Sequence, residues 1–180
     1  MKNTLALSLI LFSFIGCIGG EDPITKTDQE IELSNSIKSP AKLRVKTVYG
    51  DIIIELDQRN APLTSERIKA LTQEGFYNGL PFHRVIPGHL IQTGDPTGTG
   101  EGGSGKNIPF EENDLPHLEG SVAMARKELD KNSGDSQFFI CLRDNSKLNG
   151  IYVVFGKVTS GLEVAKQISK GDKIITMSVE

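Results

Sequence analysis

An arginine in an apolar setting is the feature of the sequence that most suggests chemistry. Arg84 lies in the run FHRVI, Gln92 follows in LIQTGD, and Phe139 lies further on in QFFICL. A guanidinium stays charged and presents its donors in a rigid fork, so it can stabilise a developing charge or lone pair on a bound molecule. On composition alone, such an arginine is more often an exposed strand residue and such a phenylalanine more often part of the core.

A glycine-rich segment lies between Gln92 and Phe139. Residues 98–103 fit the pattern GxGxxG, and residues 100–106 fit most of a P-loop. Both patterns bind phosphate where a strand precedes them and a helix follows, because the N–H groups at the helix N-terminus then face the anion. Here Lys106 is followed by Asn-Ile-Pro, which gives no start to a helix. We therefore favour a structural surface loop over a phosphate site.

The other reactive side chains form no familiar catalytic group. The three histidines, His83, His89 and His117, accompany neither a nucleophile elbow nor an HExxH motif. Cys141 lies within an apolar run, where a buried and inert thiol is expected. Its only companion is Cys17, so the sequence implies neither a disulfide framework nor a zinc cluster. We expect no metal and no other cofactor.

Short apolar stretches must position these residues. Alternation over residues 43–49 and the run 52–56 indicate a hairpin with a turn at Tyr49-Gly50-Asp51. Asn60-Ala61-Pro62 opens a helix that Gly75 ends, and the spacing of Leu162, Ala165 and Ile168 suggests a second helix ending at Gly171. Further strands are expected over 82–86, 90–93, 121–125, 137–142, 152–158 and 174–179.

Many short strands with two helices far apart favour an antiparallel barrel or sandwich over alternating strand–helix repeats. The pattern by itself leads no further than a small β-rich domain, compatible with binding an extended peptide.

Three motifs resemble the signatures of the cyclophilin-type peptidyl-prolyl cis/trans isomerases. FHRVIPGHLIQTGD is similar to the central signature, GDSQFFICL to the second and NGIYVVFGKV to the third, in the same order and register. The resemblance extends over about residues 43–179. It implies a mainly β fold: a closed eight-stranded antiparallel barrel capped by two α-helices, with the substrate groove on its outer face. The implied activity is rotation about X–Pro bonds in proline-containing polypeptides, without a cofactor.

The resemblance also implies residue roles. Arg84 matches the catalytic arginine, Gln92 the glutamine that binds substrate backbone, and Phe139 a wall of the proline pocket. The same motifs imply these substrate-binding residues: Phe82, His89, Leu90, Met124, Ala125, Leu148 and Tyr152.

Two positions depart from the family pattern. His89 stands where phenylalanine usually closes the pocket, and Lys147 stands where many eukaryotic members have tryptophan. The second departure predicts weak binding of cyclosporin. The alternative to an enzyme is a cyclophilin fold kept as a surface adhesin or holdase with little catalysis. Retention of Arg84, Gln92 and Phe139 favours the enzyme, and His89 keeps the alternative open.

Size and charge bound the remaining functions. The chain has 180 residues, of which 37% are hydrophobic and 24% charged, as in an ordinary globular protein. This length suffices for one compact domain with extra sequence at an end. A net charge of -3 gives no electrostatic footprint for nucleic acid. We expect a monomer without a nucleic-acid partner.

The N-terminal sixteen residues resemble a lipoprotein signal peptide. Lys2 precedes an apolar run over residues 5–15 that is too short to span a bilayer. Gly16-Cys17 at its end resembles the bacterial lipobox, although Phe14 stands where leucine is usual. The alternative is an ordinary signal peptide or uncleaved anchor with an incidental cysteine.

This interpretation divides the chain into three parts. Residues 1–16 are the signal peptide, residues 17–40 are a lipidated Cys17 and a polar tether, and residues 41–180 are the isomerase domain. The expected location is the bacterial cell envelope, with a lipid anchor in the membrane and the domain on the periplasmic or surface face.

Overall fold

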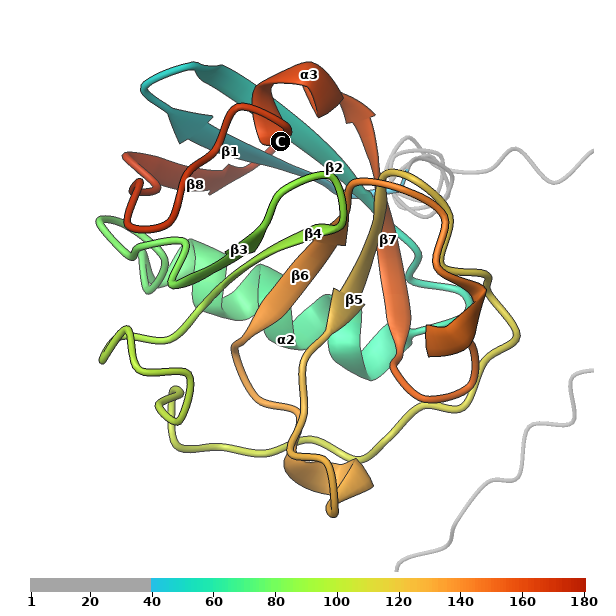
Figure 1. The fold of residues 1–180 in the computed structure, drawn as a ribbon. Helices are drawn as coiled ribbons and strands as arrows, with labels where there is room; N and C mark the ends of the chain where they lie inside the picture. Colours follow the sequence, from blue (N-terminus) through green and yellow to red (C-terminus); the bar gives the residue numbers. More distant parts are fainter. Residues whose placement is uncertain (1–39) are drawn as a thin grey trace, which may run out of the picture. The chain divides into compact units, whose positions relative to one another are not determined.

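The computed structural model describes residues 40–180; the predicted signal peptide, Cys17 and nearly all of the tether lie outside the described residues. One antiparallel sheet of eight strands makes up the domain, with the order β3-β4-β6-β5-β7-β2-β1-β8 (Figure 1). The strands are β1 (Lys42–Thr47), β2 (Gly50–Leu56), β3 (Arg84–Ile86), β4 (Leu90–Thr93), β5 (Ser121–Met124), β6 (Phe138–Cys141), β7 (Val154–Ser160) and β8 (Thr176–Val179). The helices are α2 (Pro62–Gln73) and α3 (Leu162–Ala165), with the short 3-10 turns η1 (Lys131–Ser133) and η2 (Ser146–Leu148).

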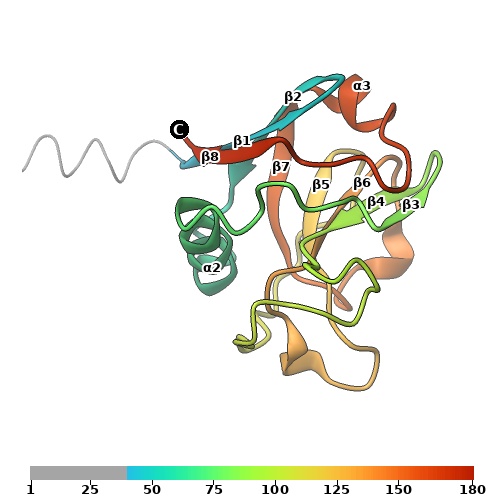
Figure 2. The same ribbon diagram turned by 90° about the vertical axis from the view of Figure 1, so that its left-hand side faces the viewer.

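The eight antiparallel strands confirm the predicted fold class, but the barrel is not fully closed. The sheet curls so that the segments just before its edge strands β3 and β8 run side by side, while the two strands themselves form no ladder (Figure 2). The residues just before these strands join them instead: the Phe82 N–H donates to the Asp172 carbonyl at 2.8 Å and the Ile174 N–H to the Leu80 carbonyl at 2.9 Å. Pro81, which forms an isolated bridge to Lys173 at this seam, has no N–H to donate, so a regular ladder cannot continue through it.

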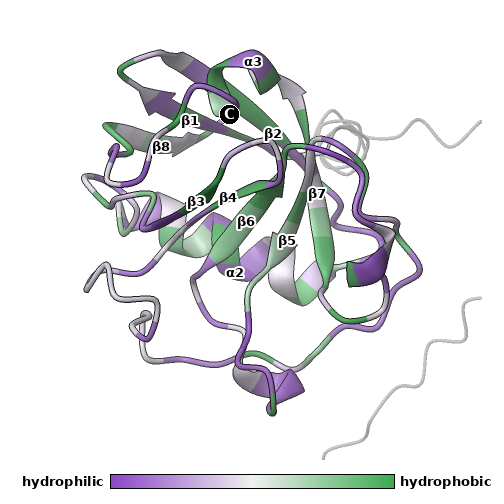
Figure 3. Ribbon diagram, viewed as in Figure 1, coloured by the Kyte–Doolittle hydropathy of each residue, from purple (hydrophilic) through white to green (hydrophobic). Residues whose placement is uncertain are grey.

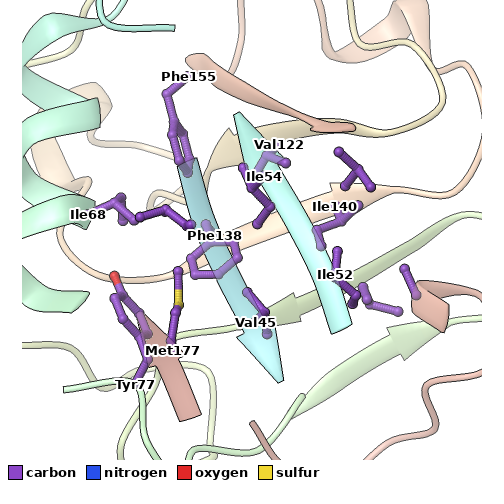
Figure 4. Close-up of a cluster of buried hydrophobic side chains, with 14 of the residues drawn as sticks. Val45, Ile52, Ile54, Ile68, Tyr77, Val122, Phe138, Ile140, Phe155 and Met177 are labelled. Atoms are coloured by element: carbon purple, nitrogen blue, oxygen red, sulfur yellow. The ribbon is translucent and has the colours of Figure 1, made fainter. Parts of the chain in front are cut away.

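Alternation along the strands separates the inside of the curled sheet from its outside. In β1 every second residue is buried, beginning with Leu43, and the same holds in β2 from Ile52 to Leu56. Apolar residues lie mainly along the strands, while many loop segments are hydrophilic (Figure 3). Side chains from strands far apart in the sequence, including Val45, Val122 and Ile140, meet in one core (Figure 4).

Aromatic side chains fill the centre of this core. The ring of Phe138 lies edge-on to the ring of Tyr77 at a centroid distance of 5.6 Å and edge-on to that of Phe155 at 6.2 Å. Such edge-to-face contacts add to the stabilisation that burial provides. The Tyr77 hydroxyl is buried too, and it donates a hydrogen bond to the Ser136 carbonyl at 2.9 Å. This bond ties the segment after α2 to the start of β6.

Helix α2 begins at Pro62, as the sequence predicts, and contacts β7 and β8 (Figure 2). Ile68 and Leu71 on its buried side enter the core. No side chain of its own caps its N-terminus; the carboxylate of Glu111 accepts from the Leu63 N–H at 2.8 Å and the Thr64 N–H at 2.7 Å. A negative charge at this end also complements the helix dipole.

Helix α3 is shorter than the spacing of Leu162, Ala165 and Ile168 suggests, because it ends at Ala165. Ile168 is nevertheless buried in the core, from a turn that follows the helix. The buried face was therefore predicted correctly, while the helical length was not. Among residues 40–180, no helix has the length and apolar character needed to cross a membrane.

The glycine-rich segment over residues 98–106 is a loop with no helix after it, as the sequence predicts. It is anchored by Asp95, whose side chain is buried and accepts from the Thr97 N–H at 2.7 Å and the Gly100 N–H at 2.5 Å. Burial alone would raise the pKa of Asp95, but these hydrogen bonds and those from the Thr97 hydroxyl and the Gly102 N–H outweigh it and lower the pKa to about 2.

Gly94 allows this anchor to form. Its φ is +91°, and a Cβ at this position would collide with the backbone carbonyl of Ser136. The Ser136 hydroxyl also donates to the Gly94 carbonyl at 2.8 Å. Only glycine combines this conformation with so close an approach of two chain segments.

Replacing Asp95 with asparagine tests the anchor. A carboxyl whose pKa falls from 3.8 to about 2 on folding stabilises the protein above pH 4 and loses this effect as the pH drops toward 2. We expect Asp95→Asn to reduce the free energy of unfolding by about 2 kcal/mol at pH 7, and by about half as much at pH 3. Denaturant unfolding of both proteins across this range measures the difference. Asp114→Asn, at an exposed carboxylate, should have little effect, and an Asp95→Asn deficit equal at pH 7 and pH 3 would contradict the assignment.

Candidate active site

The strand register places the predicted catalytic residues in one line across the sheet. Arg84 in β3 is paired with Gln92 in β4, and Gln92 is paired with Phe139 in β6. The line continues to Ala123 in β5 and Val154 in β7. Directly paired residues have side chains on the same face of a sheet. We call these five residues the outer row, because the alternate residues on the opposite face form the core.

A second apolar cluster covers this outer face, separate from the main core. Its buried members are Leu90, Ala123, Phe139, Cys141 and Val154, and its partly buried members are Leu115, Ala125, Leu148 and Tyr152. We call this set the outer cluster. Ala123 lies directly opposite Phe139, and its small side chain leaves room for the ring. The arrangement offers an apolar surface for a small ring, with a guanidinium two strands away.

Two glutamines orient the guanidinium. Arg84 is exposed, and its Nη1 donates to Oε1 of Gln92 at 3.3 Å. Nε2 of Gln92 donates to Oε1 of Gln137 at 2.8 Å, and Nε2 of Gln137 donates to the carbonyls of Gly100 and Gly102 at 2.9 and 2.8 Å. Because both carbonyls require an amide N–H, the oxygen of Gln137 must face Gln92, and the oxygen of Gln92 is then available to Arg84.

Sequence reasoning missed Gln137. Its only signal was its position two residues before Phe139, which places both side chains on the same side of an extended chain. Its role depends on the glycine-rich loop, whose carbonyls bind it across 35 and 37 residues of sequence. The loop, which the sequence predicts to be structural, thus helps to fix the predicted catalytic arginine.

Phe139 is held from two sides. The ring of His117 stacks on it at a centroid distance of 6.1 Å, and the ring of Tyr152 meets it edge-on at 5.4 Å. Tyr152 is in turn covered by the guanidinium of Arg126, whose carbon lies 5.3 Å from the ring centre. These contacts limit rotation of Phe139 and so keep the apolar surface flat.

His117 is a second residue that the sequence did not assign to the site. Its Nδ1 lies 3.1 Å from Oδ1 of Asn149, which also accepts from the His117 backbone N–H at 2.9 Å. Burial lowers the pKa of His117, and the contact with Asn149 opposes this only in part. The ring is therefore neutral at pH 7 and acts as a flat surface beside Phe139.

His89 lies beside the outer cluster, in the turn just before β4. Its Nδ1 accepts from Nε of Arg143 at 3.1 Å, and its Nε2 lies 3.3 Å from Nδ2 of Asn145, an amide whose orientation depends on the histidine tautomer. Burial lowers the pKa of His89, and the charges of Arg143 and Arg84 lower it further. A neutral, hydrogen-bonded ring therefore occupies the position where the family usually has phenylalanine.

The other predicted binding residues divide between the two clusters. Leu90, Ala125, Leu148 and Tyr152 belong to the outer cluster. Phe82 and Met124 pack instead in the main core. Met124 follows Ala123 in β5, so its side chain points to the opposite face, and the residue is paired with Phe138.

An open hollow of about 640 Å³ adjoins the outer row at the Gln92 end. Gln92, Gln137, Gly102 and Ala125 line one part of it, and the loop over residues 126–130 lines another. The hollow lies where a peptide chain could continue beyond the outer cluster.

The site shows no group suited to covalent or metal chemistry. Burial raises the pKa of the Cys141 thiol to about 11, so it is protonated and poorly nucleophilic. Within residues 40–180, no group of three or more His, Cys, Asp or Glu side chains is placed to hold a metal ion. What the arrangement offers is binding, shape and one oriented positive charge.

Comparison with known proteins agrees with this geometry. Residues 42–178 match the family model described as cyclophilin type peptidyl-prolyl cis-trans isomerase/CLD. Peptidyl-prolyl cis-trans isomerase B of Bacillus subtilis is 47% identical over 129 residues, which is 72% of this chain and 90% of that protein. A peptidyl-prolyl cis-trans isomerase of Helicobacter pylori is 44% identical over 158 residues, 85% of this chain and 93% of that protein.

Solved structures show the same fold. A cyclophilin type peptidyl-prolyl cis-trans isomerase of Cryptosporidium parvum, crystallised in the presence of the dipeptide Ala-Pro, superimposes with a TM-score of 0.72 and 32% identity, over 77% of this chain and 98% of that chain. The cyclophilin AquaCyp293 of Hirschia baltica, at 22% identity, supports the fold alone, with a TM-score of 0.68 over 86% of this chain and 80% of that chain. Together with the matching family model and relatives, these similarities show that the chain belongs to the cyclophilin-type peptidyl-prolyl cis-trans isomerases.

Proposed function

We propose that this isomerase turns over X–Pro bonds of exported polypeptides at a membrane surface, with Arg84 as its catalytic residue. The observation that supports the catalytic role is the outer row, in which Arg84, Gln92 and Phe139 are in register on one face of the sheet. The hydrogen bond from Arg84 to Gln92 holds the guanidinium over the same face as the apolar surface of Phe139.

The reaction needs no bond to the enzyme. Rotation about an X–Pro bond is slow because amide resonance must be broken, at a barrier of about 20 kcal/mol. In the twisted transition state the proline nitrogen becomes pyramidal and regains a lone pair. A fixed guanidinium that donates to this nitrogen binds the twisted form more tightly than either planar form, and this difference accelerates rotation.

The energies required are within reach of such a site. Uncatalysed exchange takes about 10–100 s. Turnover of about 10–1,000 per second needs about 3–6 kcal/mol of differential binding, at about 1.4 kcal/mol per decade. One oriented charge together with exclusion of water can contribute this much. In this mechanism Phe139 and Leu90 contact the proline ring, Gln92 binds the substrate backbone, and Arg84 acts on the nitrogen.

The proposed location rests on the N-terminal sequence. An acylated Cys17 would hold the chain at a membrane, although one lipid chain alone binds only marginally and stable anchoring needs a second. Residues 18–40 are polar and would act as a tether for the domain. The domain would then meet polypeptides that have already been exported, in the bacterial cell envelope.

The catalytic role of Arg84 is tested by Arg84→Ala. Removing an interaction made chiefly in the transition state should lower kcat/KM for a proline peptide at least about tenfold, with little change in KM. A protease-coupled or NMR exchange assay measures the rate, and thermal unfolding confirms that the variant is folded. Arg59→Ala, at an exposed arginine outside the outer row, is the matched control. Equal rates for wild type and folded Arg84→Ala would exclude this mechanism, and a wild type that binds peptides without turnover would favour the holdase.

The lipid anchor is tested by Cys17→Ser. Labelling cells with a fatty-acid probe should mark the wild-type protein and not the variant, because serine lacks the thiol that starts acylation. The wild type should also sediment with membranes, and the variant should move to the soluble fraction. Label on both proteins, or on neither, would show that Cys17 is not the attachment site.

Weak cyclosporin binding is tested by Lys147→Trp. A flexible hydrated ammonium offers neither the apolar area nor the oriented indole N–H of the tryptophan found in many eukaryotic members. Losing such an anchor costs about 2–4 kcal/mol, or about 30- to 1,000-fold in affinity. Cyclosporin titrations in the same peptide assay should give tighter inhibition of Lys147→Trp than of the wild type. Tight inhibition of the wild type would mean that Lys147 does not occupy this position in the groove.

A further inference from the structure

Two cations lie beside the outer cluster without an ionic partner. Arg143 lies two residues after the end of β6, and Lys147 belongs to η2, next to Leu148 of the outer cluster. Both side chains are exposed. Neither forms a salt bridge with any of residues 40–180. Exposed cations are common on protein surfaces. A role in ligand binding therefore depends on where these two side chains lie and on which of their N–H groups are free.

The guanidinium of Arg143 is held in a way that leaves its outer edge open. Its Nε donates to Nδ1 of His89 at 3.1 Å, which fixes the plane of the group beside the outer cluster. No hydrogen bond joins its Nη1 or Nη2 to any described residue. Two free, parallel N–H groups on a positioned guanidinium match the spacing of the two oxygens of a carboxylate.

The nearest carboxylates of the chain are engaged elsewhere. Asp144 follows Arg143 in sequence, but its Oδ1 accepts from the Glu119 N–H at 2.8 Å. The carboxylate of Glu119 pairs with Lys166 at 3.0 Å. His89 adds no charge, because the neutral ring is the form that accepts from Arg143. Asp144 keeps its negative charge, which acts on Cys141 of the outer cluster. Arg143 and Lys147 therefore outnumber the one unpaired carboxylate beside them, and neither cation is paired with it.

The opposite end of the outer cluster carries a different set of charged residues. The strands β4 and β6 run from the pair Leu90–Cys141, near Arg143, to the pair Thr93–Phe138. Beyond the second pair lies the hollow of about 640 Å³, whose lining carries Glu101, Glu128 and Asp130 together with Arg126 and Lys127. A peptide with its proline on the outer cluster would thus extend over mixed charge on one side, and past Arg143 and Lys147 with the single carboxylate of Asp144 on the other.

We propose that Arg143, positioned by His89 and assisted by Lys147, forms a carboxylate-binding subsite that selects polypeptides with Asp or Glu directly before or directly after the proline. The inference rests on the proposed isomerase site and adds a substrate preference to it. Arg143 acts as a specificity residue and not as a catalytic one, because it meets a flanking side chain and not the proline nitrogen. Lys147 contributes long-range attraction, while the fork of Arg143 gives the geometry.

Peptides that differ in one side chain test the subsite. We would compare Ala-Ala-Pro-Glu with Ala-Ala-Pro-Gln, and Ala-Glu-Pro-Ala with Ala-Gln-Pro-Ala, by NMR exchange for kcat/KM and by NMR titration for Kd. The wild type should favour glutamate over glutamine by about three- to tenfold in one of the two placements, as expected for a solvent-accessible but well-oriented ion pair. The ratio should fall toward 1 in about 1 M salt, which screens exposed charges.

Three variants separate the proposal from a general charge effect. Arg143→Gln should reduce the Glu:Gln ratio to about 1 while turnover of the glutamine peptides stays within about twofold, and Arg143→Lys should keep only part of the preference because it lacks the fork. Lys46→Gln removes an exposed charge from β1 and should leave the ratio at its wild-type value.

The outcomes distinguish the subsite from the isomerase function. Turnover of glutamine peptides by the wild type reports on the isomerase alone. A Glu:Gln ratio near 1 for the wild type in both placements, or an equal ratio in the wild type and Arg143→Gln, overturns the subsite even if turnover is normal. If no peptide is turned over, the Kd ratios decide the same question, because the subsite requires tighter binding of a glutamate peptide that Arg143→Gln abolishes.

Discussion

The register of β3, β4, β6 and β5 is the constraint on which both the core and the site depend. Because side chains alternate between the faces of a strand, the pairing that places Arg84, Gln92 and Phe139 outside also places Ile91 and Ile140 inside. A slip of one residue would exchange the two sets, exposing core residues and burying a guanidinium. The hydrophobic core therefore fixes the positions of the polar site. No additional interaction is required to bring Arg84 and Phe139 onto one surface.

The strand register does not fix the orientation of the Arg84 guanidinium. The glycine-rich loop does so through a chain of hydrogen bonds. The carbonyls of Gly100 and Gly102 bind Gln137, which turns Gln92 toward Arg84. Asp95 fixes the N-terminal part of the loop. The Arg67–Asp135 ion pair fixes its C-terminal part, where the Ser104 hydroxyl and the Gly105 N–H donate to the Asp135 carboxylate. Backbone carbonyls and buried carboxylates thus supply rigidity that exposed side chains could not, because a solvated arginine otherwise samples many rotamers.

The sequence predicted what is local and periodic, and missed what depends on distant partners. Strand β4 and the start of α2 have the predicted bounds because apolar alternation and Pro62 act within a few residues. The motif resemblance selected Arg84, Gln92 and Phe139, and the structure places them together. Gln137 and His117 were missed, since their roles come from contacts 30 or more residues away in sequence with the loop carbonyls and Asn149. The open seam between β3 and β8 was also missed, because pairing of strands far apart in the chain leaves no periodic signal.

The positions at which this chain departs from the family pattern can be related to the small free energy that the reaction requires. Differential stabilisation of a few kcal/mol can come from one oriented charge and an apolar surface, so the proposed mechanism asks no more of the site than the outer row offers. In the proposed mechanism, residues at its edge such as Arg143 would meet the flanking parts of a polypeptide. At this edge the chain carries His89 where the family usually has phenylalanine and Lys147 where many eukaryotic members have tryptophan, and Arg143 is held by His89. Replacing apolar area with neutral imidazole and cationic groups weakens contact with apolar ligands and favours charged ones. If Arg84 is the catalytic residue, as proposed, the choice of polypeptide would then depend on residues at the edge of the site and not on the arginine itself.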